Sequence, residues 1–454
     1  TRTISSAASD VYKRQSIGLA FWSFMTFLSG TAKSFLALSV YRFGVGIGES
    51  SASPSAYSLL ADYFSPKVRA TVISIYASGL YIGSGIGIFI GGLIVDNWNN
   101  AYPIISEAPF GLKGWQVAFM AVGIPGMLLA LLTWQIKEPP RGLSEGLSSS
   151  ESKNPLKETF KELVGLTPFG LVGSDNFKKE LSINIIFTIL IFLASYYLYV
   201  LTGDFLQWTA FGIGVYVICN WIHGLKNRDP VAFLLIFKSK ALLLGLLSFP
   251  FITFVTYALG AFGPSFYIRN FSMTATEVGI IYGLITVFGS MIGVICGGIL
   301  GDKLRETYVN GKLYLIMASA VLTGVTAIGF IHSENLVASF TWKFVYHIAS
   351  TAWLGCAAST VTELVLPRLR AVASAFFILM LSMIGLALGP YLTGMVSDIY
   401  INSGLLPGPA LKNAMTLTLV VLVLPFGLLA VACKYLKNDE AEIYEKARSL
   451  GEEI

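Results

Sequence analysis

The sequence predicts an all-α polytopic membrane protein. Of its 454 residues, 54% are hydrophobic and only 13% are charged, and the mean hydropathy is +0.69. A soluble domain carries about 25% charged residues, so this chain lacks the polar side chains to cover a water-soluble globule. The composition therefore excludes a soluble enzyme and a disordered protein. It also excludes a nucleic-acid-binding protein, despite a net charge of +5.

Twelve apolar stretches are long enough to cross a bilayer, which takes about 20 mostly apolar residues per helix. Each is bounded by a charged or Pro/Gly-rich break, and none alternates as an outer-membrane strand does. They cover residues 16–34, 36–62, 70–96, 115–135, 181–201, 206–224, 240–263, 277–299, 313–332, 338–364, 371–397 and 413–435. We therefore expect twelve membrane-spanning helices.

The basic residues orient these spans. With residues 1–15 placed inside, 25 of the 31 Lys and Arg lie on the cytoplasmic side and 4 lie outside. The remaining two, Arg42 and Lys343, lie within spans. Cytoplasmic loops are enriched in Lys and Arg, so we expect both termini in the cytoplasm. The expected location is the inner (cytoplasmic) membrane of a bacterium.

The spans and the polar segments divide the chain into five regions. Residues 136–180 form a linker, Ser/Gly/Pro-rich at its start, with a short amphipathic helix expected at 155–165. The expected regions are an incomplete four-span bundle (1–135), this cytoplasmic linker (136–180), a two-helix insert and loop (181–237), a six-helix bundle (238–436) and a solvated helical tail (437–454).

An internal repeat relates residues 62–96 to residues 363–398. Three matched positions have an offset of 301 residues: Pro66, Arg69 and Ala70 correspond to Pro367, Arg370 and Ala371. Four more have an offset of 302 residues: Gly83, Gly87, Gly92 and Asp96 correspond to Gly385, Gly389, Gly394 and Asp398. Related halves are the usual construction of secondary transporters, with the substrate site between them.

Several motifs resemble the major facilitator superfamily. The segment Gly298-Ile-Leu-Gly-Asp302-Lys303-Leu-Arg305 is similar to its cytoplasmic loop motif. The segment Arg42-Phe-Gly-Val-Gly-Ile-Gly-Glu49, followed by Asp62 to Pro66 and by Arg69-Ala70, resembles the spinster-like branch. Anion:cation symporters share the Arg and Gly-x-x-Glu pattern and are the nearest alternative.

The resemblance implies two pseudo-symmetric helix bundles that work by alternating access. Spinster-like members export lysophospholipids or sphingoid lipids and are thought to be proton-coupled. The first matching span here resembles the family's third. We therefore expect two helices to be missing at the N-terminus, together with the family's acidic coupling residue, and residues 181–224 to add a two-span insert.

Charges within the spans are the first candidate site. Arg42 and Glu49 are seven residues apart, so they share one helix face about 10 Å apart along the axis. A charge in a span costs at least ~2.5 kcal/mol and normally faces the bundle interior. Glu49 with Arg42 is a candidate proton switch, or a pair that only fixes packing. Lys343, with His347 one turn on, either meets an anionic headgroup or snorkels and packs.

Three further sets complete the candidate site. Asp302, Lys303 and Arg305, with the repeat residues Arg69 and Arg370, form a gating loop that holds the inner helix ends, or are ordinary loop charges. The other two sets are Gly79, Gly83, Gly87 and Gly91 as a helix-packing seam, and Phe254, Tyr257 and Phe377 as a cavity for acyl chains or as plain packing.

Enzyme signals are absent from the sequence. The three His are not at metal-ligand spacing, and there is no P-loop and no Ser-His-Asp set. The four Cys lie in apolar runs, which argues against a disulfide framework. We expect a monomeric, non-enzymatic transporter without cofactor or metal, which moves a small amphiphilic or anionic substrate with protons. Alternatives are a small organic anion symporter, a membrane-embedded lipid-modifying enzyme and a non-transporting fragment.

Overall fold

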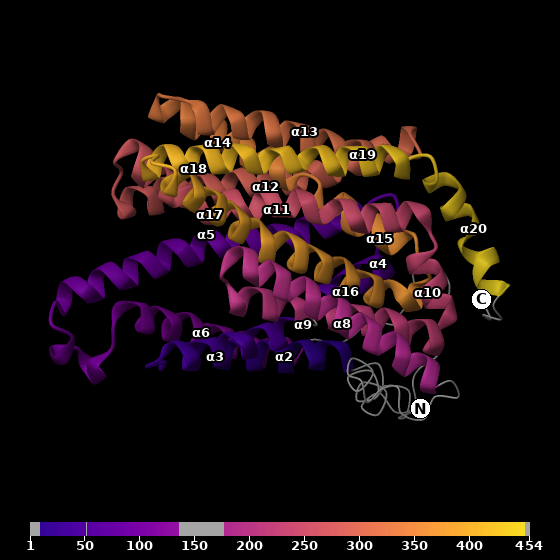
Figure 1. Cartoon of the computed structure of the whole chain (residues 1–454), viewed down its shortest axis with the longest axis horizontal. Coiled ribbons are helices and arrows are strands. Elements are labelled where there is room, and N and C mark those ends of the chain that lie inside the picture. Colours follow the sequence, from indigo (N-terminus) through magenta and orange to yellow (C-terminus); the bar gives the residue numbers. More distant parts are fainter. Residues whose placement is uncertain (1–9, 51, 136–176, 450–454) are drawn as a thin grey trace.

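The computed structural model describes residues 10–50, 52–135 and 177–449, which contain helices and no strand (Figure 1). The expected amphipathic helix at 155–165 and most of the linker lie outside the described residues. Within them, the all-helical prediction is confirmed. Most of the long helices run roughly parallel to one another in Figure 1, as expected for a bundle that crosses a bilayer.

The N-terminal part of the chain forms a group of helices that ends before the linker. These are α2 (Asp10–Ser29), α3 (Phe35–Glu49), α4 (Ala52–Tyr63), α5 (Arg69–Ala101) and α6 (Gly114–Thr133). After the linker come α8 (Phe177–Thr202), α9 (Phe205–Arg228) and the short α10 (Pro230–Phe237).

The C-terminal half contains the remaining helices. They are α11 (Lys240–Phe271), α12 (Ala275–Thr307), α13 (Gly311–His332), α14 (Leu336–Thr351), α15 (Leu354–Glu363), α16 (Arg370–Met380), α17 (Ala387–Asn402), α18 (Pro407–Thr418), α19 (Val423–Ala432) and α20 (Leu436–Arg448). A π-helical segment, η5 (Leu381–Leu386), joins α16 to α17. A short 3-10 segment, η6 (Leu419–Leu422), joins α18 to α19.

Nine helices in the described residues are long and apolar enough to cross a membrane. Two expected single spans are wrong in detail, because 36–62 is broken into α3 and α4, and 338–364 into α14 and α15. The second break follows Thr351, whose hydroxyl donates to His347 O (2.8 Å) and Ser290 O (3.0 Å). Side-chain hydroxyls that bond the preceding turn weaken helices in this way.

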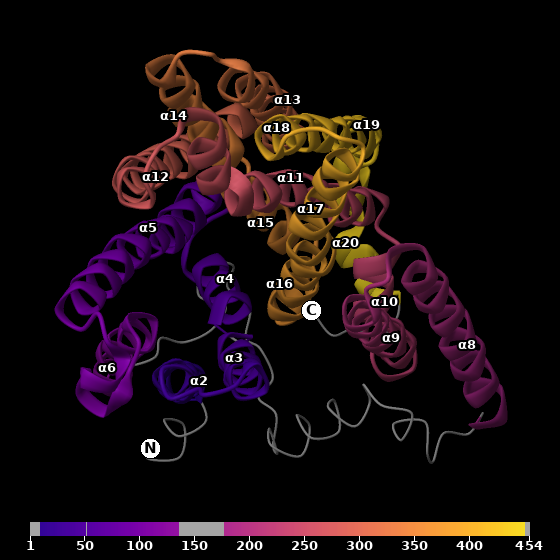
Figure 2. The same ribbon diagram turned by 60° about the vertical axis from the view of Figure 1, so that its left-hand side comes forward.

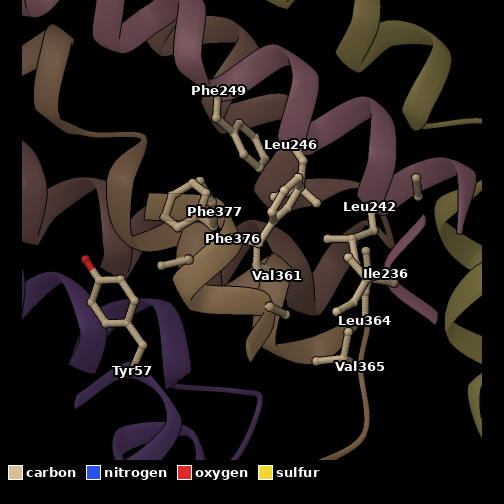
Figure 3. Close-up of a cluster of buried hydrophobic side chains, with 14 of the residues drawn as sticks. Tyr57, Ile236, Leu242, Leu246, Phe249, Val361, Leu364, Val365, Phe376 and Phe377 are labelled. Atoms are coloured by element: carbon tan, nitrogen blue, oxygen red, sulfur yellow. The ribbon is translucent and has the colours of Figure 1, made fainter. Parts of the chain in front are cut away.

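The largest core lies in the C-terminal half. Phe249 of α11 packs edge-on against Phe377 of α16, with ring centroids 5.7 Å apart, and is stacked on Trp353. Tyr57 of α4, in the N-terminal half, is a buried member of this cluster and lies at its side in Figure 3. Ile73 of α5 is fully buried in the same cluster. The two halves therefore share apolar packing near their contact.

Helices α5 and α12 run antiparallel and in contact along their whole lengths. At the end that the charge distribution predicts to be cytoplasmic, called the inner end below, the Asp302 carboxylate accepts from Thr71 N (2.7 Å). At the opposite end, called the outer end, the Thr276 hydroxyl contacts Asp96 (3.2 Å). Midway, Gly85 lies directly against Val287. Figure 2 shows this pair between α6 on one side and α14 on the other. It is the main contact between the halves.

The expected seam at Gly79, Gly83, Gly87 and Gly91 is wrong for the described residues. A Cβ built at any of these four glycines would meet no atom within 4 Å. The close approach to α12 instead involves Gly85 and, on α12, Gly298, which touches Ser74 and the Ala70 carbonyl. In the C-terminal repeat, Gly389 does contact the α11 backbone at Phe254. Glycines spaced four residues apart thus share one face of a helix, but the spacing does not show which element packs against that face.

The α5–α12 contact gives a matched test on one helix. Gly298→Leu places a side chain where Ser74 and the Ala70 carbonyl lie, so we expect the halves to be forced apart and thermal stability to fall. Gly279→Leu is the control, because a Cβ at Gly279 meets nothing within 4 Å. Unfolding of both purified variants in detergent checks this. Equal stability of the two would show that α5 and α12 are not in close contact.

Candidate functional site

Charged side chains from both halves meet at the inner end of the α5–α12 contact. We call Asp62, Arg69, Asp302, Lys312, Glu363 and Arg370 the inner lock. Arg69, Lys312 and Arg370 are at most 3% exposed, and Asp62 and Asp302 are at most 8% exposed. Charges buried to this degree are costly unless they are paired or hydrogen-bonded, and each of these side chains has at least one such partner.

The two repeat arginines converge on one backbone carbonyl. Arg69 donates to Ala61 O (2.8 Å), eight residues earlier, and Arg370 donates to the same oxygen (3.4 Å) from the other half. Arg370 also donates to Thr362 O, again eight residues earlier (3.3 Å). The repeat thus places equivalent arginines in equivalent positions, and the two meet at Ala61.

Arg370 also makes an ion pair across the two halves. Its Nη1 lies 2.9 Å from Oδ1 of Asp62 on α4, and the two side chains are 3% and 10% exposed. Removing one member of a buried pair leaves an uncompensated charge, at a cost of about 3–5 kcal/mol. This pair therefore favours the state in which the inner helix ends are together.

Asp302 fixes the start of α5. Its carboxylate accepts from Thr71 N (2.7 Å), the Thr71 hydroxyl (2.7 Å) and Ala70 N (3.3 Å). These amides belong to the first turn of α5, where a helix has unpaired N–H groups and a partial positive charge. A carboxylate from α12 thus serves as the cap of a helix in the other half.

Lys312 completes the lock from α13. Its ammonium lies 2.6 Å from Glu363 Oε1 and 3.5 Å from Asp302 Oδ1, and donates to Ser359 (2.8 Å) and Pro66 O (3.4 Å). A single buried amine thereby joins α12, α13 and α15 to the loop before α5. A cavity of about 600 Å³ lies beside the lock, lined by Asp302, Glu363, Arg370 and residues of α20.

The sequence identified only part of this lock. Asp302, Arg69 and Arg370 lie in it, whereas Lys303 is exposed and Arg305 pairs within its own half with Glu440 of α20 (2.5 Å). Asp62 and Glu363, which the sequence analysis did not select, occupy equivalent repeat positions 301 residues apart. This shared spacing is the signal in the sequence that could have identified both carboxylates as site residues. The tail is also packed rather than freely solvated, since Leu436 and Ala447 are buried.

Arg42 and Glu49 lie on α3, and no ion pair joins them among the described residues. Both side chains are exposed on the helix. The Arg42 guanidinium lies 5.8 Å from the centroid of the Phe119 ring on α6. The structure therefore places the two charges on one helix without forming the direct pair that the sequence analysis considered.

Lys343 is fully buried among aromatic rings. Its ammonium lies 4.2 Å from the ring centroid of Phe330, 4.5 Å from that of Tyr346 and 4.9 Å from that of Tyr282. It has no hydrogen-bond partner among the described residues, so it does not snorkel to the surface. Ring faces attract a cation, by about 2 kcal/mol or more when water is excluded.

His347 lies one turn after Lys343 and contacts α12. Its Nδ1 lies 3.2 Å from the Ser290 hydroxyl and its Nε2 lies 3.3 Å from the Thr286 hydroxyl. Both ring nitrogens therefore have a hydroxyl neighbour. With Lys343, it gives α14 two buried basic side chains, in addition to Lys312 of α13 and Arg370 of α16 in the same half.

The expected aromatic cavity is not formed as such. Phe377 is 1% exposed and lies in the main core, and Phe254 is 8% exposed and packs against Gly389. Tyr257 alone of the three is exposed, at 40%. In the described residues no group of three or more His, Cys, Asp or Glu could hold a metal ion.

Comparison of the sequence with known families identifies the fold. The sequence profile of the Major Facilitator Superfamily matches residues 3–390. The chain belongs to this superfamily. It is therefore a membrane transporter rather than an enzyme, which excludes the lipid-modifying enzyme considered from the sequence.

Among curated proteins, this superfamily member is 24% identical over 433 residues to an MFS-type efflux pump of Mycolicibacterium smegmatis, with 95% of the chain and 78% of the pump aligned. It is 22% identical to Protein spinster of Drosophila melanogaster over 86% of the chain and 52% of that protein. It is also 22% identical to human Protein spinster homolog 1, over 61% of that protein. The chain thus spans only about half to three-fifths of these spinster proteins.

Solved structures show the same fold. A bacterial homologue of the human lysosomal transporter spinster, in an inward-facing and unoccupied conformation, superposes with a TM-score of 0.51 at 22% identity. The alignment covers 98% of the chain and 86% of that structure. The double-tryptophan mutant of XylE gives 0.53 at 14% identity, covering 97% of the chain and 88% of that structure. The expected distant relation to the spinster branch is confirmed.

The inner lock predicts that an isosteric substitution of one of its carboxylates lowers the stability of the protein strongly. Asp62→Asn leaves Arg370 buried without its counter-charge, so we expect the free energy of unfolding to fall by about 3 kcal/mol. Glu442→Gln is the control, since Glu442 pairs with Lys446 at 48% exposure and such pairs contribute about 1 kcal/mol at most. Chemical denaturation in detergent measures both. Similar losses in the two variants would show that Asp62 is not in a buried pair.

Proposed function

We propose that the protein is a secondary active transporter that works by alternating access and couples transport to protons. The observation that carries this proposal is the inner lock. Arginines from equivalent positions of the two halves meet at Ala61 O, and Arg370 pairs with Asp62 across the halves. The two contacts of Arg370, with Ala61 O and with Asp62, are made between parts that alternating access requires to separate and rejoin.

The proposed proton-coupling residues are Arg42 and Glu49 in the N-terminal half. Both lie within an apolar helix, where an ionisable side chain is functional more often than structural. Protonation of Glu49 would remove its attraction to Arg42 and so change the net charge of α3. His347, an ionisable side chain one turn after Lys343, is the corresponding candidate in the other half.

The proposed substrate is a lysophospholipid or a similar amphiphile with an anionic group. Several relatives of the protein are named spinster proteins, and one solved relative is described as a bacterial homologue of a human lysosomal transporter. Lys343 is the reason for proposing an anionic group on the substrate. A buried ammonium without an acceptor can pair with a phosphate or a carboxylate. A small organic anion shares this chemistry and is the second candidate.

Substrate identity and proton coupling are tested together in proteoliposomes. Glu49→Gln in the complete protein should abolish transport that depends on a pH gradient, because Gln cannot exchange a proton. Glu107→Gln, in the short exposed η1 (Ile105–Glu107), is the control. Retained gradient dependence in Glu49→Gln would exclude Glu49 as the coupling residue. Lysolipids and short organic acids serve as the two substrate classes.

The role of Lys343 is tested by Lys343→Met. Methionine fits an aromatic pocket without charge, so we expect folding to be kept and the KM for an anionic substrate to rise about tenfold or more. The KM for an uncharged amphiphile such as a monoacylglycerol should change little. Lys303→Met, at an exposed position, should change neither. An equal loss for both substrates would show that Lys343 does not bind the anionic group.

A further inference from the structure

Helix α9 follows one helix of the C-terminal half across the membrane. We call α16, η5 and α17 together the gate helix, because Arg370 of the inner lock is its first residue. Trp221 is stacked on Phe376 with centroids 5.6 Å apart, and Trp208 lies edge-on to Tyr391 at 5.4 Å. Because residue numbers rise along one helix as they fall along the other, α9 and the gate helix are antiparallel.

Polar contacts fasten the two helices at both ends. At the outer end, the Tyr391 hydroxyl donates to Asp204 Oδ2 (2.6 Å). At the inner end, Arg368 donates to both carboxylate oxygens of Asp229, at 2.6 and 3.3 Å. Arg368 lies two residues before Arg370, so the inner fastening is next to the lock.

The middle of the contact coincides with the π-helical turn. Gly214 of α9 lies against the end of the Met383 side chain of η5, which would have to shift to admit a Cβ. Close by, the Gln207 side-chain amide donates to Ala387 O (3.3 Å), the first residue after the π segment. Single π turns within α-helices are uncommon and occur often at functional sites. Helix α9 thus packs on the irregular part of the gate helix.

Asp229 holds its charge in this setting. Burial would raise the pKa of its carboxyl, but the hydrogen bonds from Arg368 and from Ala232 N outweigh this and keep the pKa below its ordinary value. The carboxylate therefore stays ionised throughout the neutral range. It also caps α10 through Ala232 N (2.9 Å), which fixes its position independently of Arg368.

Helix α8 reinforces α9 from the far side. Asn184 of α8 donates to Asn220 Oδ1 (2.8 Å), and the Tyr216 hydroxyl donates to Asn184 Oδ1 (3.1 Å). None of the most apolar stretch of α8 is buried in the protein, so its outer face is left to lipid. The two helices therefore form one hairpin with the gate helix on its inner side.

We propose that the α8–α9 hairpin is a brace for the gate helix, and that Asp229 is the positioning residue through which it places Arg370 in the inner lock. The proposal rests on the transport function proposed above. The hairpin belongs to the region 181–237 that the sequence predicts as a two-helix insert. The brace gives that region a role: it restrains the gate helix at both membrane surfaces and at its π turn.

The test measures access to the inner cavity and needs no substrate. Val365, 3% exposed, lines that cavity and is replaced by Cys, whose maleimide labelling is compared with that of the same protein without the replacement. Asp229→Asn keeps the α10 cap, because Asn caps helices as well as Asp does, but loses the ion pair. We expect labelling to be about threefold to fivefold faster, because this factor corresponds to the free energy that a half-exposed ion pair contributes.

A double-mutant cycle separates positioning from general damage. Arg368→Gln alone should match Asp229→Asn, and the double variant should be no faster than either, because the pair acts as a unit. Glu107→Gln, in the exposed η1 far from this cavity in the chain, should leave the rate unchanged. Labelling of Asp229→Asn at the rate of the unchanged protein, or additive effects in the double variant, would overturn the proposal. So would faster labelling in Glu107→Gln.

A second pair of variants tests the brace at the π turn. Gly214→Leu pushes α9 away from Met383 and should also speed labelling at residue 365, whereas Ile213→Leu, on the exposed neighbour, should not. Equal rates in these two would overturn the brace. If lysolipid transport fails while these labelling results hold, only the proposed substrate is lost.

Discussion

The contact between Arg370 and Asp62 is the constraint on which the arrangement of the two halves depends. It is a buried ion pair between helices that belong to different bundles. A bilayer supplies no hydrophobic force to press such helices together, so packing and polar contacts must do so. The charges that define the inner lock are therefore also what gives the bundles a fixed relative position at this end.

The same reasoning explains why the lock contains so many hydrogen bonds to backbone. A buried charge is costly unless its remaining donors or acceptors are also used. Arg69, Arg370 and Asp302 use carbonyls and amides at helix ends, where such groups are unpaired anyway. The bonds of Arg69 to Ala61 O and of Arg370 to Thr362 O lie within one half each, whereas the bond of Asp302 to Thr71 N crosses between the halves. The arginines therefore keep part of their hydrogen bonding independently of the contact between the halves.

The composition and the internal repeat of the sequence predicted much of the fold, but they predicted a smaller part of the candidate site. Nine helices of the described residues are long and apolar enough to cross a bilayer, whereas the sequence predicted twelve spans. Arg69 and Arg370 were found because identical residues recur 301 apart, whereas Asp62 and Glu363 are equivalent without being identical. Lys312 was read as an ordinary inside charge, since loop position does not reveal burial. Gly83 and Phe377 show the same limit: spacing defines a face, and only the fold supplies its neighbour.

The breaks between α3 and α4 and between α14 and α15 occur at equivalent places of the two halves. In each case the intramembrane charge, Arg42 or Lys343, lies on the first piece, and the acidic lock residue, Asp62 or Glu363, lies on the second. Between α14 and α15 the two linking residues, Ala352 and Trp353, keep right-handed helical backbone angles, so the break is a local interruption of the helical hydrogen bonding. The buried Lys343 and the lock residue Glu363 are therefore connected through one nearly continuous helical path from the middle of the bilayer to its surface.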